Sequence, residues 1–89
     1  MRAVLTVVGE DKKGIIGRVS GALSDFKVNI EEISQTVLQN YFTMMMIVDL
    51  VECELSFAEL QVEMKKIGEG FGVAIHVMHE DIFKAMHSV

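Results

Sequence analysis

The sequence predicts an α+β domain with ferredoxin-like βαββαβ order, in which a four-stranded antiparallel sheet carries two helices on one face. Apolar runs with strand spacing occur four times along the 89 residues. Two segments between them repeat apolar residues every three or four positions, as amphipathic helices do. A capping box before the second of these segments agrees with the same order. A chain of this size has too few residues for a second core, so we expect one domain.

The first strand is expected at residues 3–8, where a mostly apolar, β-branched run leaves neither side polar. Such a run is typical of a central strand. An amphipathic helix follows at about residues 14–26, because its apolar residues recur at helical spacing. Gly17 and Gly21 lie on this helix, and each costs about 1 kcal/mol relative to alanine. We therefore expect the helix to pass close to the sheet or to a neighbouring molecule there.

The second strand is expected at residues 28–37, where the apolar alternation changes phase at Glu31-Glu32. This change predicts a β-bulge, and a bulge with two charges favours an edge strand. Residues 39–40 form the predicted hairpin turn, and the third strand spans residues 41–51. One of its faces is wholly apolar and is expected to meet the helices: Phe42, Met44, Met46, Val48 and Leu50. The other is expected to be half solvated or to meet another subunit: Tyr41, Thr43, Met45, Ile47 and Asp49.

The second helix begins at a capping box, with Ser56 as the N-cap and Glu59 three residues later. Gly68 or Gly70 is predicted to end it. The fourth strand is expected at residues 73–78.

A short added helix is expected in the tail, where apolar residues at helical spacing follow an acidic start. The predicted organisation is a ferredoxin-like domain at residues 1–79 and a C-terminal helical tail at residues 80–89. The tail is expected to pack on the same domain or on its partner.

Composition excludes several classes of function. The net charge is −5, and no run of lysine or arginine exceeds two residues, so we expect no nucleic-acid binding. No apolar segment approaches the roughly 20 residues that span a bilayer, so we expect no membrane association. Cys53 is the one cysteine, which fits a reducing compartment. With no secretory signal in view, we expect a cytoplasmic protein.

The segment with the clearest functional pattern is the connection between the first strand and the first helix, Val7-Val8-Gly9-Glu10-Asp11-Lys12-Lys13-Gly14-Ile15-Ile16. A strand, a charged turn and a helix start leave several backbone N–H groups unpaired and pointing the same way. Such a site suits a carboxylate or another small anion. The same residues also fit a tight strand–helix connection with no ligand. Asn29 likewise fits a turn residue bonded to its own backbone.

With these residues placed, the chain resembles an ACT domain, a small-molecule sensing module of amino-acid metabolism. The pattern G-x-D-x-x-G-I covers Gly9 to Ile15, and Val28-Asn29-Ile30 opens a strand about fifteen residues later. Residues 42–50 also resemble the third strand of the family, and residues 79–87 the tail of its stand-alone members. The resemblance covers about three quarters of the chain, and its motifs are specific in combination.

The resemblance implies an amino acid held between the first turn of one domain and the Asn-Ile strand start of its partner. Family members commonly pair through sheet edges or helices, so a homodimer is expected. We expect no cofactor. A metabolic enzyme or regulator is a further expected partner. Carried over residue by residue, the ligand-binding positions are Gly9, Asp11, Lys12, Gly14, Ile15, Ile16, Asn29 and Ile30.

Other reactive side chains do not combine into a site. Strand alternation places His76 and His79 on opposite faces, so one metal ion could not easily collect both. Cys53 lies between Glu52 and Glu54 with no nearby cation to activate it. With no catalytic arrangement in view, we expect a non-enzymatic regulatory module that binds a small amino acid at a homodimer interface. The alternative is a ligand-free interaction module that docks a metabolic enzyme or regulator through its sheet face and tail.

Overall fold

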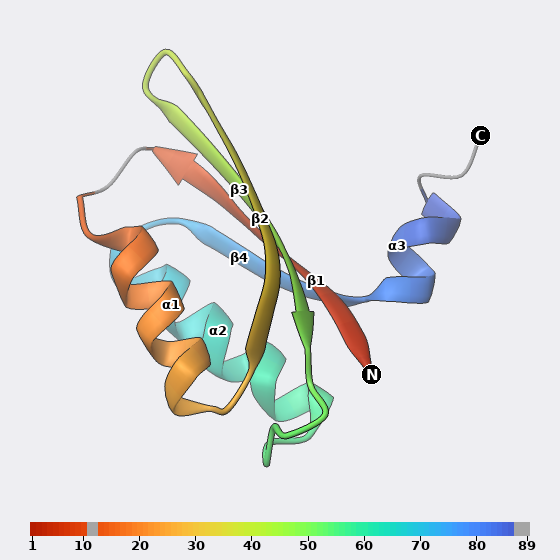
Figure 1. Cartoon of the computed structure of the whole chain (residues 1–89). Coiled ribbons are helices and arrows are strands. Elements are labelled where there is room, and N and C mark those ends of the chain that lie inside the picture. The colour runs from red at the N-terminus through yellow and green to blue at the C-terminus, as the bar shows by residue number, and fades with distance from the viewer. Residues whose placement is uncertain (11–12, 87–89) are drawn as a thin grey trace.

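The computed structural model describes residues 1–10 and 13–86. Its elements follow the order β1 (Arg2–Glu10), α1 (Ile15–Asp25), β2 (Asn29–Leu38), β3 (Tyr41–Asp49), α2 (Phe57–Phe71), β4 (Ala74–His79) and α3 (Glu80–Met86). The strands form one sheet in the order β2-β3-β1-β4, and every neighbouring pair is antiparallel. Helices α1 and α2 lie on the same face of the sheet (Figure 1). The predicted ferredoxin-like fold is confirmed.

The core lies between the two helices and the sheet face that they cover. β1 is the central strand, as predicted, with β3 and β4 as its neighbours. The apolar face of β3 meets the helices, also as predicted. The core residues are Ala3, Leu5, Val7, Ile15, Val19, Leu23, Val28, Phe42, Met44, Met46, Val48, Leu60, Met64, Val73, Ile75 and Val77.

β2 is an edge strand, and its pairing with β3 shifts register between Ile30 and Glu32. The bulge predicted from the phase of the apolar residues is therefore confirmed. The turn after β2 contains Gln39 in a left-handed conformation, with φ 57°. The tip of the β2–β3 hairpin extends beyond the helices in Figure 1, so Leu38 at the end of β2 is 72% exposed.

The capping box of α2 is present with both hydrogen bonds. The backbone N–H of Glu59 donates to Ser56 Oγ at 3.1 Å, and the backbone N–H of Ser56 donates to Glu59 Oε1 at 2.8 Å. These bonds satisfy donors that would otherwise lack partners at the helix start.

The predicted end of α2 at Gly68 or Gly70 is wrong, because the helix continues to Phe71 and Gly72 caps it with φ 73°. Gly68 lies inside the helix and is buried. A Cβ at Gly68 would lie 2.7 Å from the carbonyl oxygen of Val73 and 2.9 Å from Ile75 Cγ1. Gly68 thus permits the close packing of α2 on the start of β4.

Gly17 and Gly21 of α1 are exposed, and a Cβ built on either one would meet nothing within 4 Å. The expected close approach of α1 to the sheet at these positions is therefore wrong. A close approach to a neighbouring molecule stays a prediction.

The opposite face of the sheet is only partly covered. α3 follows β4 directly and packs against β1 and β4. Arg2 Nε lies 3.1 Å from Glu31 Oε1 on β2 and 3.3 Å from Glu80 Oε2 on α3, so it links an edge strand to the tail helix. Toward the hairpin, Val8 and Tyr41 are exposed. Among the described residues, no helix is long and apolar enough to cross a membrane.

Candidate functional site

The connection between β1 and α1 supplies one part of the predicted ligand site. Gly14 is the N-cap of α1 with φ 86°, a left-handed conformation that favours glycine. Within the described residues, no side chain caps this helix start, and its first turn contains no acidic residue. The N–H groups of this turn keep their capacity to donate to an anion. Asp11 and Lys12 lie outside the described residues.

Three other predicted positions near this turn have different environments. Gly9 is half-buried, and a Cβ there would lie 2.7 Å from Val73 Cγ1, so packing alone requires a glycine. Ile15 is 2% exposed and belongs to the core, whereas Ile16 is 39% exposed beside the turn. The side chain of Ile15 is therefore unavailable to a ligand, whereas Ile16 offers its side chain.

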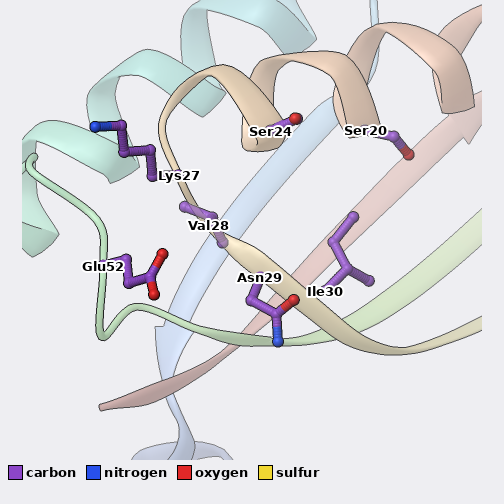
Figure 2. A pocket seen from close by; sticks show the side chains of 7 residues that line it. All are labelled: Ser20, Ser24, Lys27, Val28, Asn29, Ile30 and Glu52. Atoms are coloured by element: carbon purple, nitrogen blue, oxygen red, sulfur yellow. The ribbon is translucent and has the colours of Figure 1, made fainter.

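Asn29 and Ile30 lie at the other end of α1, where they line a pocket of about 460 Å³ between α1, β2 and the loop after β3. Figure 2 shows Ser20 and Ser24 on α1 above the start of β2, with Glu52 coming from that loop. Lys27 and Val28 complete the lining. Below, we call this the α1–β2 pocket.

The α1–β2 pocket is polar and carries charges of both signs. The Lys27 ammonium lies 3.0 Å from Glu54 Oε1, so its charge has a partner outside the lining. The hydroxyls of Ser20 and Ser24, the amide of Asn29 and the carboxylate of Glu52 can all accept a hydrogen bond. These acceptors suit an ammonium group.

Sequence reasoning found Asn29 and Ile30 as site residues but missed the other five lining residues, Ser20, Ser24, Lys27, Val28 and Glu52. The spacing of Ser20 and Ser24 placed both on the polar side of α1, which was the available signal. Glu52 lies twenty-three positions after Asn29 in the sequence, so only the tertiary fold brings it here.

One chain does not bring the two parts of the predicted site together. Asn29 pairs with Asp49, and Asp49 pairs with Arg2, so Asn29 is level with the start of β1. Gly9 lies seven residues further along β1, which corresponds to roughly 23 Å at about 3.3 Å per residue. A ligand that contacts both parts needs a second copy of the chain.

No metal centre was identified among the described residues, since no three histidine, cysteine or acidic side chains are grouped to hold an ion. Among the described residues, the carboxyl of Glu59 has a shifted pKa, and Glu59 lies far from the site in the sequence. The backbone N–H of Ser56 donates to the carboxyl of Glu59 and, with a smaller contribution from the Ser56 hydroxyl, holds the pKa of that carboxyl below its usual value.

Together these features define a class of protein: a small ferredoxin-like sandwich with polar groups at both ends of its first helix. The ACT domain family model matches residues 2–78, and the chain belongs to that family. ACT domains are commonly small-molecule regulatory modules.

A UPF0237 protein from Methanopyrus kandleri is 49% identical over 88 residues, covering 99% of this chain and 98% of the relative. The solved ACT domain protein from Streptococcus pneumoniae is 42% identical, with a TM-score of 0.83 and 98% of each chain covered. A formyltetrahydrofolate deformylase from Pseudomonas putida has a TM-score of 0.80 over 91% of this chain and 30% of its own. At 14% identity that likeness shows the fold alone.

Proposed function

We propose that this protein is a non-enzymatic, cytoplasmic regulatory module that binds a small amino acid between two copies of the chain. The observation that carries the proposal is the start of α1 behind Gly14, which no side chain of the described residues caps. Backbone N–H groups at such a position favour a carboxylate. The α1–β2 pocket of the second copy supplies acceptors for the α-ammonium, with Asn29 among them.

The two parts of the site constrain the arrangement of the dimer. They lie at opposite ends of α1, so a two-fold axis across this helix brings the start of one α1 to the end of the other. Such a dimer has two equivalent ligand sites and an isologous interface. Ligand binding then stabilises the dimer relative to the separate chains, and this linkage is the proposed regulatory mechanism.

A thermal-shift screen against the twenty amino acids tests this proposal. A ligand at about a hundred times its dissociation constant stabilises the fold by about 2.7 kcal/mol. For a domain of this size, the melting temperature should rise by roughly 10 °C or more. One responding amino acid, or a group with related side chains, supports the proposal and names the effector. A flat screen contradicts it.

A ligand-free interaction module is the second candidate, and the open sheet face favours it. Leu38 is 72% exposed, Tyr41 61% and Val8 46%. Exposed apolar residues that gather on one face often mark a protein interface. Under this alternative the thermal-shift screen is flat, while Tyr41→Lys abolishes capture of a metabolic enzyme or regulator.

A further inference from the structure

A second cavity lies on the far side of the molecule from the α1–β2 pocket, with a volume of about 630 Å³. It is bounded by the outer edge of β4, the first turns of α2 and the start of α3. We call it the β4-edge cavity. Its lining shares no residue with the α1–β2 pocket and consists of Met1, Phe57, Gln61, His76, Val77, Met78, His79 and Ile82.

The walls of the β4-edge cavity are mainly apolar, and its volume lies in the range of about 300–1,000 Å³ that is typical of small-molecule sites. The rings of Phe57 and His79 lie nearly parallel at 20°, with their centroids 6.4 Å apart. Val77 is 6% exposed and forms part of the fixed core beneath. These surfaces favour a flat apolar group.

Gln61 occupies a backbone hydrogen-bond acceptor at the edge of β4. Its side-chain amide donates a hydrogen bond to the carbonyl oxygen of Val77 at 2.9 Å. That carbonyl belongs to an edge strand, where it would otherwise accept from an added strand. Because Gln61 occupies it, the cavity is less suited to an added peptide strand than to a ligand that packs on side chains.

The polar groups of the cavity favour an anionic ligand. His79 Nδ1 accepts a hydrogen bond from the backbone N–H of Asp81 at 3.1 Å, so the proton of a neutral His79 lies on Nε2 and is available to an acceptor. In a chain of net charge −5, this lining contains two imidazoles and, among the described residues, no carboxylate.

The first turn of α3 places two carboxylates, Glu80 and Asp81, directly after His79. Asp81 Oδ2 lies 3.8 Å from His79 Nδ1, but the Asp81 side chain is 82% exposed. Glu80 lies within 3.7 Å of Lys84 and 3.3 Å of Arg2, so its charge is compensated. From this geometry we propose that the β4-edge cavity binds a small aromatic carboxylate, with the ring on Phe57 and Ile82 and the carboxylate at the Nε2–H of His79.

A backbone amide NMR titration with three probes tests this site. Phenylacetate should give saturable shifts at Phe57, Gln61 and Val77. Phenethylamine has the same ring and the opposite charge, and hexanoate has the same charge and no ring. We expect both to bind at least about tenfold more weakly than phenylacetate. The shifts should spare Ser20 and Asn29, which separates this site from the amino-acid site proposed above.

Ile82→Asp places a carboxylate in the cavity wall and should weaken phenylacetate binding at least about tenfold. Val62→Asp is the matched control, because Val62 is 52% exposed on α2 outside the lining and Ile82 is 56% exposed. Should Ile82→Asp fail to fold by circular dichroism, His79→Ala takes its place. His79→Ala should narrow the difference in affinity between phenylacetate and phenethylamine.

Several results would overturn the proposal. Equal or tighter binding of phenethylamine contradicts the charge argument, and an unchanged difference in affinity between the two probes in His79→Ala does the same. Shifts that do not saturate, or that map to another surface, contradict the site itself. A wild-type dimer in sedimentation that Ile82→Asp dissociates would also overturn it, because a second copy of the chain then covers the cavity.

Discussion

Gly9 of β1 lies against Val73 so closely that a Cβ built on Gly9 would stand 2.7 Å from Val73 Cγ1 and 3.2 Å from Val73 Cα. Val73 is 7% exposed and precedes β4, so its backbone has little room to move. The first glycine of the turn motif is therefore required by packing, whether or not a ligand binds. Loss of binding in a Gly9 variant alone does not identify a ligand contact.

Gly9→Ala should lower the free energy of unfolding by about 1–3 kcal/mol, because overpacking forces Val73 or the strand to shift. Urea denaturation measures this change. Gly70→Ala is the control, since Gly70 is exposed in α2 and a Cβ there meets nothing within 4 Å. The free energy of unfolding of the control should rise by up to about 1 kcal/mol, because alanine has a higher helix propensity than glycine. Losses of equal size in both variants would contradict the packing argument.

Glu59 should make the stability of the fold depend on pH in the acidic range. The hydrogen bonds from Ser56 hold the pKa of Glu59 in the folded state below its ordinary value. A group with a lowered folded pKa stabilises the fold above its unfolded pKa, and this contribution is lost as the pH falls through the folded value.

Glu59→Gln keeps an acceptor for the Ser56 N–H but does not titrate. The melting temperature should therefore fall less steeply between about pH 7 and pH 2 in Glu59→Gln than in the wild type. If the melting temperatures of the wild type and of Glu59→Gln fall in parallel as the pH is lowered, the capping bond does not favour the charged form of Glu59.

Local sequence signals predicted the elements well, because each depends on a few neighbouring residues. The phase change at Glu31-Glu32 marked the bulge, and the spacing of Ser56 and Glu59 marked the cap. The end of α2 was missed because three glycines within five residues all fit a helix end. Only the contact of Gly68 with residues 73 and 75 shows that it belongs inside the helix.

The candidate site was harder to predict, since it combines distant parts of the chain. Asn29 could be named from its motif, but its neighbours come from α1 and from the loop after β3. The separation between Gly9 and Asn29 follows from strand register, which the motif does not contain.

Asn29→Ala should separate ligand binding from folding. Asn29 is exposed, and in the described part of the chain its side chain makes no hydrogen bond. Its removal should change the unfolding free energy by less than about 0.5 kcal/mol, while the amino-acid-induced rise in melting temperature disappears. Gln35→Ala on the same strand is a matched amide control and should keep that rise. An undiminished rise in Asn29→Ala would exclude Asn29 from the site.

Alanine substitutions at Gly17 and Gly21 test the arrangement of the proposed dimer. In a single chain, alanine at either position meets nothing within 4 Å and should stabilise α1 by about 1 kcal/mol. In a dimer whose two α1 helices lie antiparallel and in contact, the methyl groups of the introduced alanines would push the helices apart. The double variant Gly17→Ala/Gly21→Ala should therefore stabilise the monomer and weaken the dimer.

The opposite signs of these two effects make the experiment decisive. Urea denaturation of dilute protein should show the gain in monomer stability, and sedimentation over a concentration series should show a dissociation constant raised about tenfold or more. Gly70→Ala gives the gain in propensity of one such substitution on α2 and should leave the dimer unchanged. If the double variant is more stable and its dimer is equally tight, the interface does not cross α1. Gly14 of one copy then cannot meet Asn29 of the other across this helix, and the open sheet face becomes the surface to test.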